Sequence, residues 1–166
     1  MQFLHSNTWQ LNWADPNQQM PPQPVLDPVT RETVVDEKTE APVLEQAANF
    51  HELALEIMSS RLHDGEDVKY VFTSGEALFI FTALRMVYVE QFSASLCRTV
   101  ASLPYHNLVT LETDELVVKE QSSAIRGIRF TCCYDFTGEL LFLDSEDILT
   151  PGMLGEIENL ITSKMF

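Results

Sequence analysis

Seven short runs of strand-forming residues follow one another between Val68 and Leu143. Turn-forming residues such as Ser74-Gly75 separate them, and a regular series of short strands of this kind is typical of a sandwich or barrel. In the run that begins at Arg85 both faces carry apolar residues, as expected where one face covers a core and the other meets a helix or a partner. The predicted strands are Val68–Thr73, Ala77–Thr82, Arg85–Gln91, Leu96–Leu103, Leu108–Thr113, Ile125–Tyr134 and Glu139–Leu143.

A helix is expected on each side of this strand series. Between Glu45 and Leu62 apolar residues recur mostly at three- and four-residue spacings, which predicts an amphipathic helix that ends in the Asp64-Gly65 turn. After the last strand, Thr150 precedes Pro151 as a cap precedes the first helical residue, and the residues that follow form one apolar face. The chain is therefore predicted to be α+β.

The stretch Ala77–Asp114 resembles bacterial pleckstrin-homology-like (PH-like) domains in three motifs. A strand ends in Phe81-Thr82, Arg85 opens the next strand, and Pro104-Tyr105 introduces a later one. The resemblance implies a mainly antiparallel barrel of about seven strands over residues 65–166, with a C-terminal helix that plugs one open end. It also implies that Arg85 pairs with an acidic turn residue and that the ring of Tyr105 packs on the barrel. The alternative is an α+β protein with an unrelated, strongly bent sheet.

The first 44 residues differ in composition from the rest of the chain. They hold six of the eight prolines, and the charged run Asp36–Glu40 lacks the apolar face of a helix. We therefore expect a Pro-rich, extended acidic arm over residues 1–44, followed by the helix at residues 45–63.

An aromatic and apolar cluster precedes these prolines and supplies the candidate partner-binding residues. A purely disordered tail does not usually carry such a cluster. One interpretation is that the side chains pack back onto their own domain, as large apolar groups do when a core is available. The other is that they anchor a protein partner or a second subunit, because Trp is enriched at interface hot spots. The cluster consists of Phe3, Leu4, Trp9, Leu11 and Trp13.

The chain carries 25 acidic and 10 basic side chains, which gives a formal net charge of −15. This balance disfavours direct binding to nucleic acid, which depends on clustered Lys and Arg, and it disfavours an anionic membrane surface. The sequence does not open with a basic and apolar leader, and its apolar stretches are shorter than the ~18 residues of a membrane span. A cytoplasmic location is therefore expected.

The residues that usually carry metal or catalytic chemistry are scattered along the chain. The four histidines lack the spacing of metal ligands, and the three cysteines are interpreted as buried free thiols. Neither a phosphate-binding Gly-rich loop nor a nucleophile motif occurs, so catalytic residues, metals and cofactors are not predicted. The residues concerned are His5, His51, His63, His106, Cys97, Cys132 and Cys133.

The predicted function is that of a non-enzymatic protein–protein interaction or assembly module built on a PH-like barrel, with the N-terminal arm as a tether to a partner or another subunit. Assembly into a virus or phage particle is one version of this hypothesis. Two alternatives stay open. One is an acidic inhibitor or nucleic-acid mimic, of bacterial or phage origin, that occupies a basic site on a host protein. The other is a small-ligand binder with a pocket at the barrel mouth, near Ser74-Gly75 and the segment after Gln91.

Overall fold

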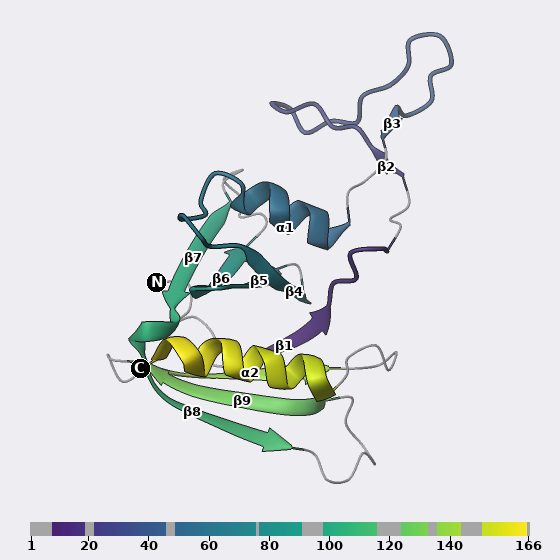
Figure 1. Ribbon diagram of the computed structural model, residues 1–166. Coiled ribbons are helices and arrows are strands. Elements are labelled where there is room, and N and C mark those ends of the chain that lie inside the picture. The colour runs from purple at the N-terminus through teal and green to yellow at the C-terminus, as the bar shows by residue number, and fades with distance from the viewer. Residues whose placement is uncertain are drawn as a thin grey trace.

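The computed structural model describes residues 8–18, 22–45, 49–75, 77–90, 98–115, 124–132, 136–143 and 151–165. Within these ranges eight strands form one curled sheet (Figure 1). They are β1 (Thr8–Trp13), β4 (Val68–Ser74), β5 (Ala77–Thr82), β6 (Arg85–Glu90), β7 (Thr99–Pro104), β8 (Leu108–Glu115), β9 (Ala124–Cys132) and β10 (Thr137–Leu143). Their order in the sheet is β7-β6-β5-β4-β1-β10-β9-β8.

All seven predicted strands are present as β4 to β10. Strands β4 to β7 pair antiparallel with one another in chain order, and so do β8 to β10. Helix α2 (Pro151–Met165) lies along the concave side between these two halves (Figure 1). It inserts Leu154, Ile157 and Ile161 into the main core. The predicted PH-like barrel with a C-terminal helix is confirmed, although its sheet is a half-barrel of eight strands rather than about seven.

The eighth strand, β1, comes from the segment predicted to be part of the arm. It pairs antiparallel with β4 and parallel with β10, with Trp9 opposite Leu140. Trp9 and Leu11 are buried while Thr8 and Gln10 are exposed, which is the two-residue alternation of a half-buried strand. Residues 8–13 therefore belong to the barrel, where they join the first and last of the seven predicted strands.

Helix α1 (Phe50–Met58) covers the outer face of β4, β5 and β6. Its residues Ala54, Ile57 and Met58 form a second apolar cluster with side chains of these strands, so β5 is buried along both faces. Val87 and Val89 of β6 belong to the same cluster. The expectation that one face of this strand meets a helix is confirmed.

The observed α1 begins at Phe50 rather than at Glu45 because Asn49 caps it, and it ends at Met58, before the Asp64-Gly65 turn where its end was predicted. The Oδ1 of Asn49 accepts a hydrogen bond from the backbone N–H of Glu52 at 2.8 Å. Its amide nitrogen donates to the carbonyls of Pro16 at 2.6 Å and Gln18 at 3.2 Å. The cap therefore fixes the start of α1 against the segment that leaves β1.

The hairpin between β9 and β10 differs from the prediction at its turn. The predicted strands Ile125–Tyr134 and Glu139–Leu143 leave residues 135–138 between them as the turn, but Gly138 lies within β10 and pairs with Phe130 across the sheet. The ring of Phe130 fills the space that a Cβ at position 138 would occupy. Close packing rather than a turn conformation therefore requires a glycine here.

Candidate functional site

Residues 22–45 form a small unit that projects from the barrel beyond α1 (Figure 1). Strands β2 (Gln23–Pro24) and β3 (Leu44–Glu45) pair antiparallel as its stem. We call residues 22–45 the projecting motif. The sequence predicted an extended arm over this segment, but here the chain turns back on itself twice.

Three valines meet at the centre of the projecting motif. The N–H of Val34 donates to the carbonyl of Val25 at 2.8 Å, the N–H of Val43 to that of Val34 at 2.9 Å, and the N–H of Val25 to that of Val43 at 2.8 Å. Successive valines are nine residues apart. The three bonds close a ring from which the stem and two loops radiate.

The first loop is closed by Asp27. Its Oδ1 accepts the backbone N–H groups of Val29 and Thr30, both at 2.9 Å, and its carbonyl accepts the N–H of Arg31 at 2.9 Å. The hydrogen bonds from Thr30 and Val29 lower the pKa of Asp27. Arg31 has a φ of 63°, the left-handed conformation that reverses the chain.

The second loop repeats the first one nine residues later. The Oδ1 of Asp36 accepts the N–H groups of Lys38 at 2.8 Å and Thr39 at 3.3 Å, and its carbonyl accepts the N–H of Glu40 at 2.9 Å. Glu40 has a φ of 55°. The pattern Val-x-Asp-x-x-Thr occurs twice in tandem, starting at residues 25 and 34, and this repeat is the sequence signal that reveals the loops.

The projecting motif exposes an unusual share of the apolar surface. None of its residues joins the two apolar clusters of the barrel. Of the ten large apolar side chains that are exposed in the described residues, six lie on this motif, and Val29 is the most exposed at 81%. A gathering of exposed apolar side chains marks a contact surface. The six are Leu26, Val29, Val34, Val35, Val43 and Leu44.

The candidate partner-binding cluster of the N-terminus is placed differently. Trp9 and Leu11 are buried in the main core, and Trp13 is half-buried against it. Phe3 and Leu4 lie outside the described residues. Of the two interpretations, packing on the same domain therefore holds for Trp9 and Leu11. The exposed apolar surface of the N-terminal region lies on the projecting motif instead.

A buried ion pair lies at the start of β6. The Nε and Nη2 groups of Arg85 donate to the carboxylate of Glu66 at 3.0 and 3.1 Å. The guanidinium also donates to the carbonyl of Arg61 at 2.6 Å and to Oγ of Ser102 at 3.0 Å. Thr82 donates its hydroxyl to Glu66 at 2.5 Å. The prediction that Arg85 pairs with an acidic turn residue is confirmed.

This network keeps Glu66 ionised although its side chain is fully buried. Burial alone would raise the pKa of the carboxyl. Hydrogen bonds from Arg85, from Thr82 and from the backbone N–H of His63 outweigh burial and leave the pKa below its ordinary value of 4.5. The ion pair therefore stabilises the fold above that pH and loses its effect as the pH falls through the lowered pKa.

Tyr105, in the short 3-10 turn η2 (Tyr105–Asn107), packs on the barrel as the resemblance implied. Its ring is buried, its hydroxyl donates to the carbonyl of Thr82 at 2.8 Å, and its N–H donates to the carbonyl of Leu84 at 3.0 Å. Burial, together with the charge of Glu66, raises the pKa of Tyr105. The next residue, His106, is exposed.

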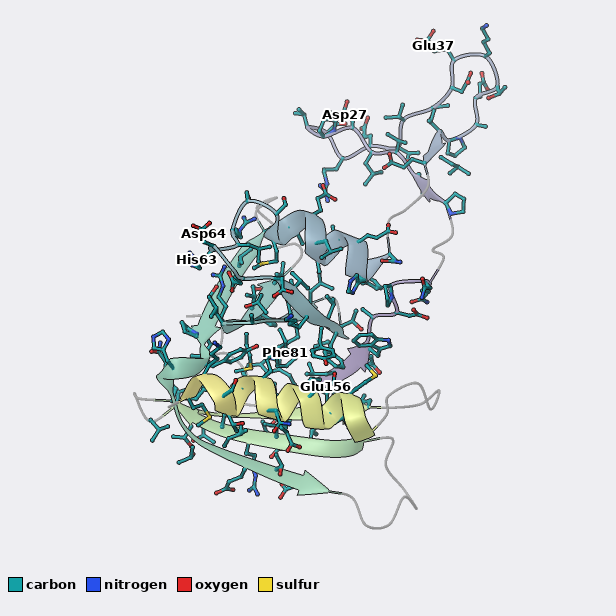
Figure 2. The ribbon with its side chains drawn as sticks, in the orientation of Figure 1. Asp27, Glu37, His63, Asp64, Phe81 and Glu156 are labelled. Carbon is teal, nitrogen blue, oxygen red and sulfur yellow. The ribbon has the colours of Figure 1, made fainter. Side chains whose placement is uncertain are left out.

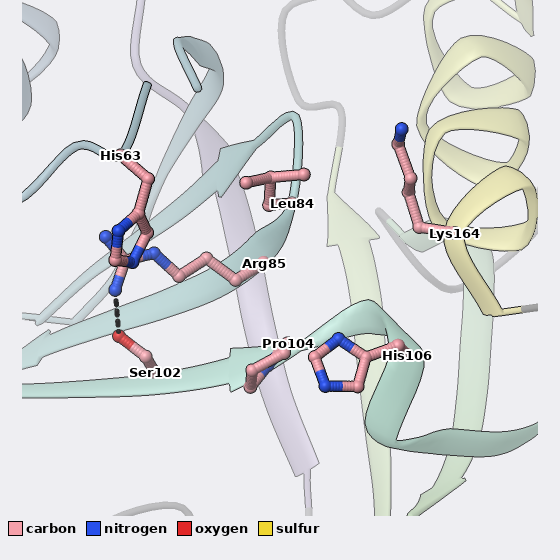
Figure 3. Close-up of a pocket in the computed structure, with 7 residues that line it drawn as sticks. All are labelled: His63, Leu84, Arg85, Ser102, Pro104, His106 and Lys164. Carbon is pink, nitrogen blue, oxygen red and sulfur yellow. Dashed lines mark hydrogen bonds between the residues drawn. The ribbon is translucent and has the colours of Figure 1, made fainter. Parts of the chain in front are cut away.

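A cavity of about 260 Å³ opens beside this network. Figure 3 shows His63 and Arg85 on one side of it and Lys164, from the last turn of α2, on the other. Ser74 and Gly75, where a pocket was expected, do not line this cavity. The sequence missed the cavity because it depends on where α2 ends against η2, beside β6 and β7. The lining residues are His63, Leu84, Arg85, Ser102, Pro104, His106 and Lys164.

The remaining chemistry-bearing residues do not converge in the part of the chain that the structure describes. Cys132 is a buried free thiol, as predicted, whereas Cys97 and Cys133 lie outside the described residues. Over the described ranges, His, Cys, Asp and Glu side chains do not gather in a group that would hold a metal ion. The helices in those ranges are too short or too polar to cross a bilayer.

Comparison with known proteins finds its matches among solved structures. No protein-family model matches the chain, and no curated protein matches it by sequence. A DUF1696-family protein with a pleckstrin-homology domain from Shewanella loihica aligns with 69% of this chain and 92% of its own, at a TM-score of 0.50 and 13% identity. This chain has a PH-like fold.

Two further bacterial structures are similar to this PH-like barrel. A pleckstrin-homology domain from Shewanella amazonensis aligns with 69% of this chain and 87% of its own, at a TM-score of 0.46 and 14% identity. A PH-domain-containing protein from Exiguobacterium sibiricum aligns with 70% of this chain and 56% of its own, at a TM-score of 0.44 and 18% identity. In the present chain, β1 and the projecting motif lie outside the seven-strand pattern that the motifs predicted.

Proposed function

We propose that this protein is a non-enzymatic interaction and assembly module, in which the PH-like barrel presents the projecting motif to a protein partner or to another subunit. The observation that carries this proposal is the concentration of exposed apolar side chains on a unit that has no core of its own. Contact with another protein would bury these side chains, and each Val or Leu buried contributes about 1.5–3 kcal/mol.

The projecting motif is organised before it meets a partner. The valine ring and the two Asp-closed loops fix its backbone, and both ends are anchored to the barrel, at one side through β1 and at the other through Asn49. A preorganised surface loses less conformational entropy on binding than a disordered tail does. This preorganisation favours the interpretation that the projecting motif is a docking element rather than a passive linker.

The net charge of −15 narrows the class of partner. It disfavours nucleic acid and anionic membranes, and it favours a protein with basic or apolar contact groups. We place this interaction in the cytoplasm of a bacterial cell.

A photo-crosslinking amino acid at Val29, in the full-length protein, tests the proposal in living cells. We expect a covalent adduct of higher mass from this position, because its side chain is exposed on the projecting motif. The matched control is the same amino acid at Leu55, an exposed apolar position on α1. Mass spectrometry of the adduct identifies the second chain.

Two outcomes would contradict the proposal. One is the absence of an adduct from Val29, and the other is an equal yield from Val29 and Leu55. An additional control replaces Asp27 and Asp36 with alanine, which removes the side chains that close both loops. The adduct from Val29 is expected to diminish in this variant.

A further inference from the structure

We propose that the cavity beside Arg85 binds the acidic tip of the projecting motif of a second copy of this chain, so that copies join head to tail. The inference rests on the proposed function and names the partner. It follows from the chemistry of the two surfaces and from their positions on the molecule.

The cavity is a cationic site in a strongly acidic protein. Arg85, Lys164 and two of the four histidines line it, and its lining contains neither Asp nor Glu. Arg85 is already paired with Glu66, whereas the described part of the chain offers Lys164 no acidic partner. The side chain of Lys164 is exposed, so that an incoming carboxylate can reach its ammonium, and the exposed His63 and His106 add N–H donors beside it.

The second loop of the projecting motif offers the complementary charge. Between Asp36 and Glu40 there are three carboxylates, on Asp36, Glu37 and Glu40, and one ammonium, on Lys38. Asp36 is used to close the loop, but the side chains of Glu37 and Glu40 are exposed. Figure 2 shows Glu37 at the far end of the projecting motif. This tip is the part of the motif that first meets another molecule.

The size and the apolar lining of the cavity suit such a tip. Ligand pockets usually have volumes of about 300–1,000 Å³. The cavity, at about 260 Å³, is smaller and accepts one or two side chains rather than a large ligand. Leu84 and Pro104 supply apolar surface beside the basic groups. Val35, which is exposed next to Asp36, supplies the apolar counterpart on the loop.

The two surfaces lie at opposite sides of one molecule. In Figure 1 the projecting motif lies at the upper right. The cavity is bordered by η2 and the C-terminal end of α2, which lie at the lower left. A tip therefore does not reach the cavity of its own chain in this arrangement. A contact that joins two different surfaces is heterologous, and its repetition produces a ring or an open chain of copies.

Charge reversal in the full-length chain tests this pairing. Lys164→Glu places a carboxylate in the cavity, and Glu37→Lys places an ammonium at the tip. Each variant alone is expected to self-associate roughly tenfold more weakly than the parent, because the side chains at positions 37 and 164 then carry like charges. An equimolar mixture is expected to recover the parent association, since position 37 of each variant then meets an opposite charge at position 164 of the other variant. Sedimentation velocity measures all four samples.

The controls separate this pairing from general charge effects and from unfolding. Glu37→Lys reduces the net charge from −15 to −13, by removing one negative and adding one positive charge, and this alone would favour association. Lys69→Glu makes the same charge change as Lys164→Glu at an exposed site outside the cavity, and it is expected to associate like the parent. Unchanged melting temperatures show that the variants fold.

The inference is overturned if the parent does not self-associate, if Lys164→Glu behaves like Lys69→Glu, or if the mixture is no stronger than its components. These results leave the proposed function intact as long as Val29 still crosslinks to another protein. Loss of that adduct, in contrast, removes the proposed function as well.

Discussion

Replacing Arg85 with alanine is expected to lower the free energy of unfolding by about 3–5 kcal/mol, because it leaves the buried carboxylate of Glu66 without its cation. Four hydrogen bonds of the guanidinium are lost at the same time, to Glu66, Arg61 and Ser102. Urea denaturation at neutral pH measures the loss. The deficit of the variant is expected to shrink in acid, since Glu66 is then protonated in both proteins.

Arg129→Ala provides the matched control for this substitution. Arg129 also pairs with carboxylates, those of Glu112 and Asp114 at 3.3 and 3.1 Å, but all three side chains are largely exposed. Exposed pairs of this kind contribute about 0–1 kcal/mol. Equal losses for the two variants would show that the Arg85 network does not stabilise the barrel more than a surface ion pair does.

Replacing Trp9 with alanine is expected to destabilise the isolated protein by about 3–5 kcal/mol, the usual cost of removing a large buried aromatic side chain. Trp9 is 5% exposed, and its ring lies 5.6 Å from that of Phe79 and 6.5 Å from that of Tyr88. Its removal leaves a cavity where β1 joins the two halves of the barrel. Chemical denaturation of the purified protein measures the change.

Gln10→Ala is the control on the same strand, because Gln10 is exposed and its loss is expected to change stability by less than about 0.5 kcal/mol. If Trp9→Ala were as stable as this control, Trp9 would not serve as a core residue and the alternative of a partner anchor would return.

The role of β1 in the barrel also determines what an N-terminal truncation would remove. A chain that begins at residue 45 lacks β1 and would expose the edges of β4 and β10.

The barrel could be predicted from the sequence because local patterns specify it. Apolar runs bounded by turns placed β4 to β10, and the Thr-Pro step followed by an apolar face placed α2. The motif residues also met their expected partners, since Arg85 pairs with Glu66 and Tyr105 is buried. These features depend mainly on short-range sequence, which is why they transfer from pattern to structure.

The N-terminal region was predicted less well because composition outweighed spacing. Prolines and charge indicated an extended arm, whereas the alternation around Trp9 and Leu11 specifies a strand. An aspartate that closes a loop occurs at position 27 and again nine residues later at position 36, and this repeat specifies the two loops.

The cavity could not be predicted from the sequence for a different reason. It forms where α2 ends beside β6 and β7, and that juxtaposition depends on the tertiary structure rather than on any local motif.

Light scattering after size-exclusion chromatography, over a series of concentrations, tests most directly whether copies meet through the projecting motif. The samples are the full-length parent and a full-length variant in which Val29 and Val35 are both serine. Both positions are exposed, so the variant is expected to remain as stable as the parent. The account predicts a parent mass that rises above the monomer mass of 18.9 kDa and a variant that stays at it. Equal masses for the two proteins at every concentration would contradict self-association through the projecting motif.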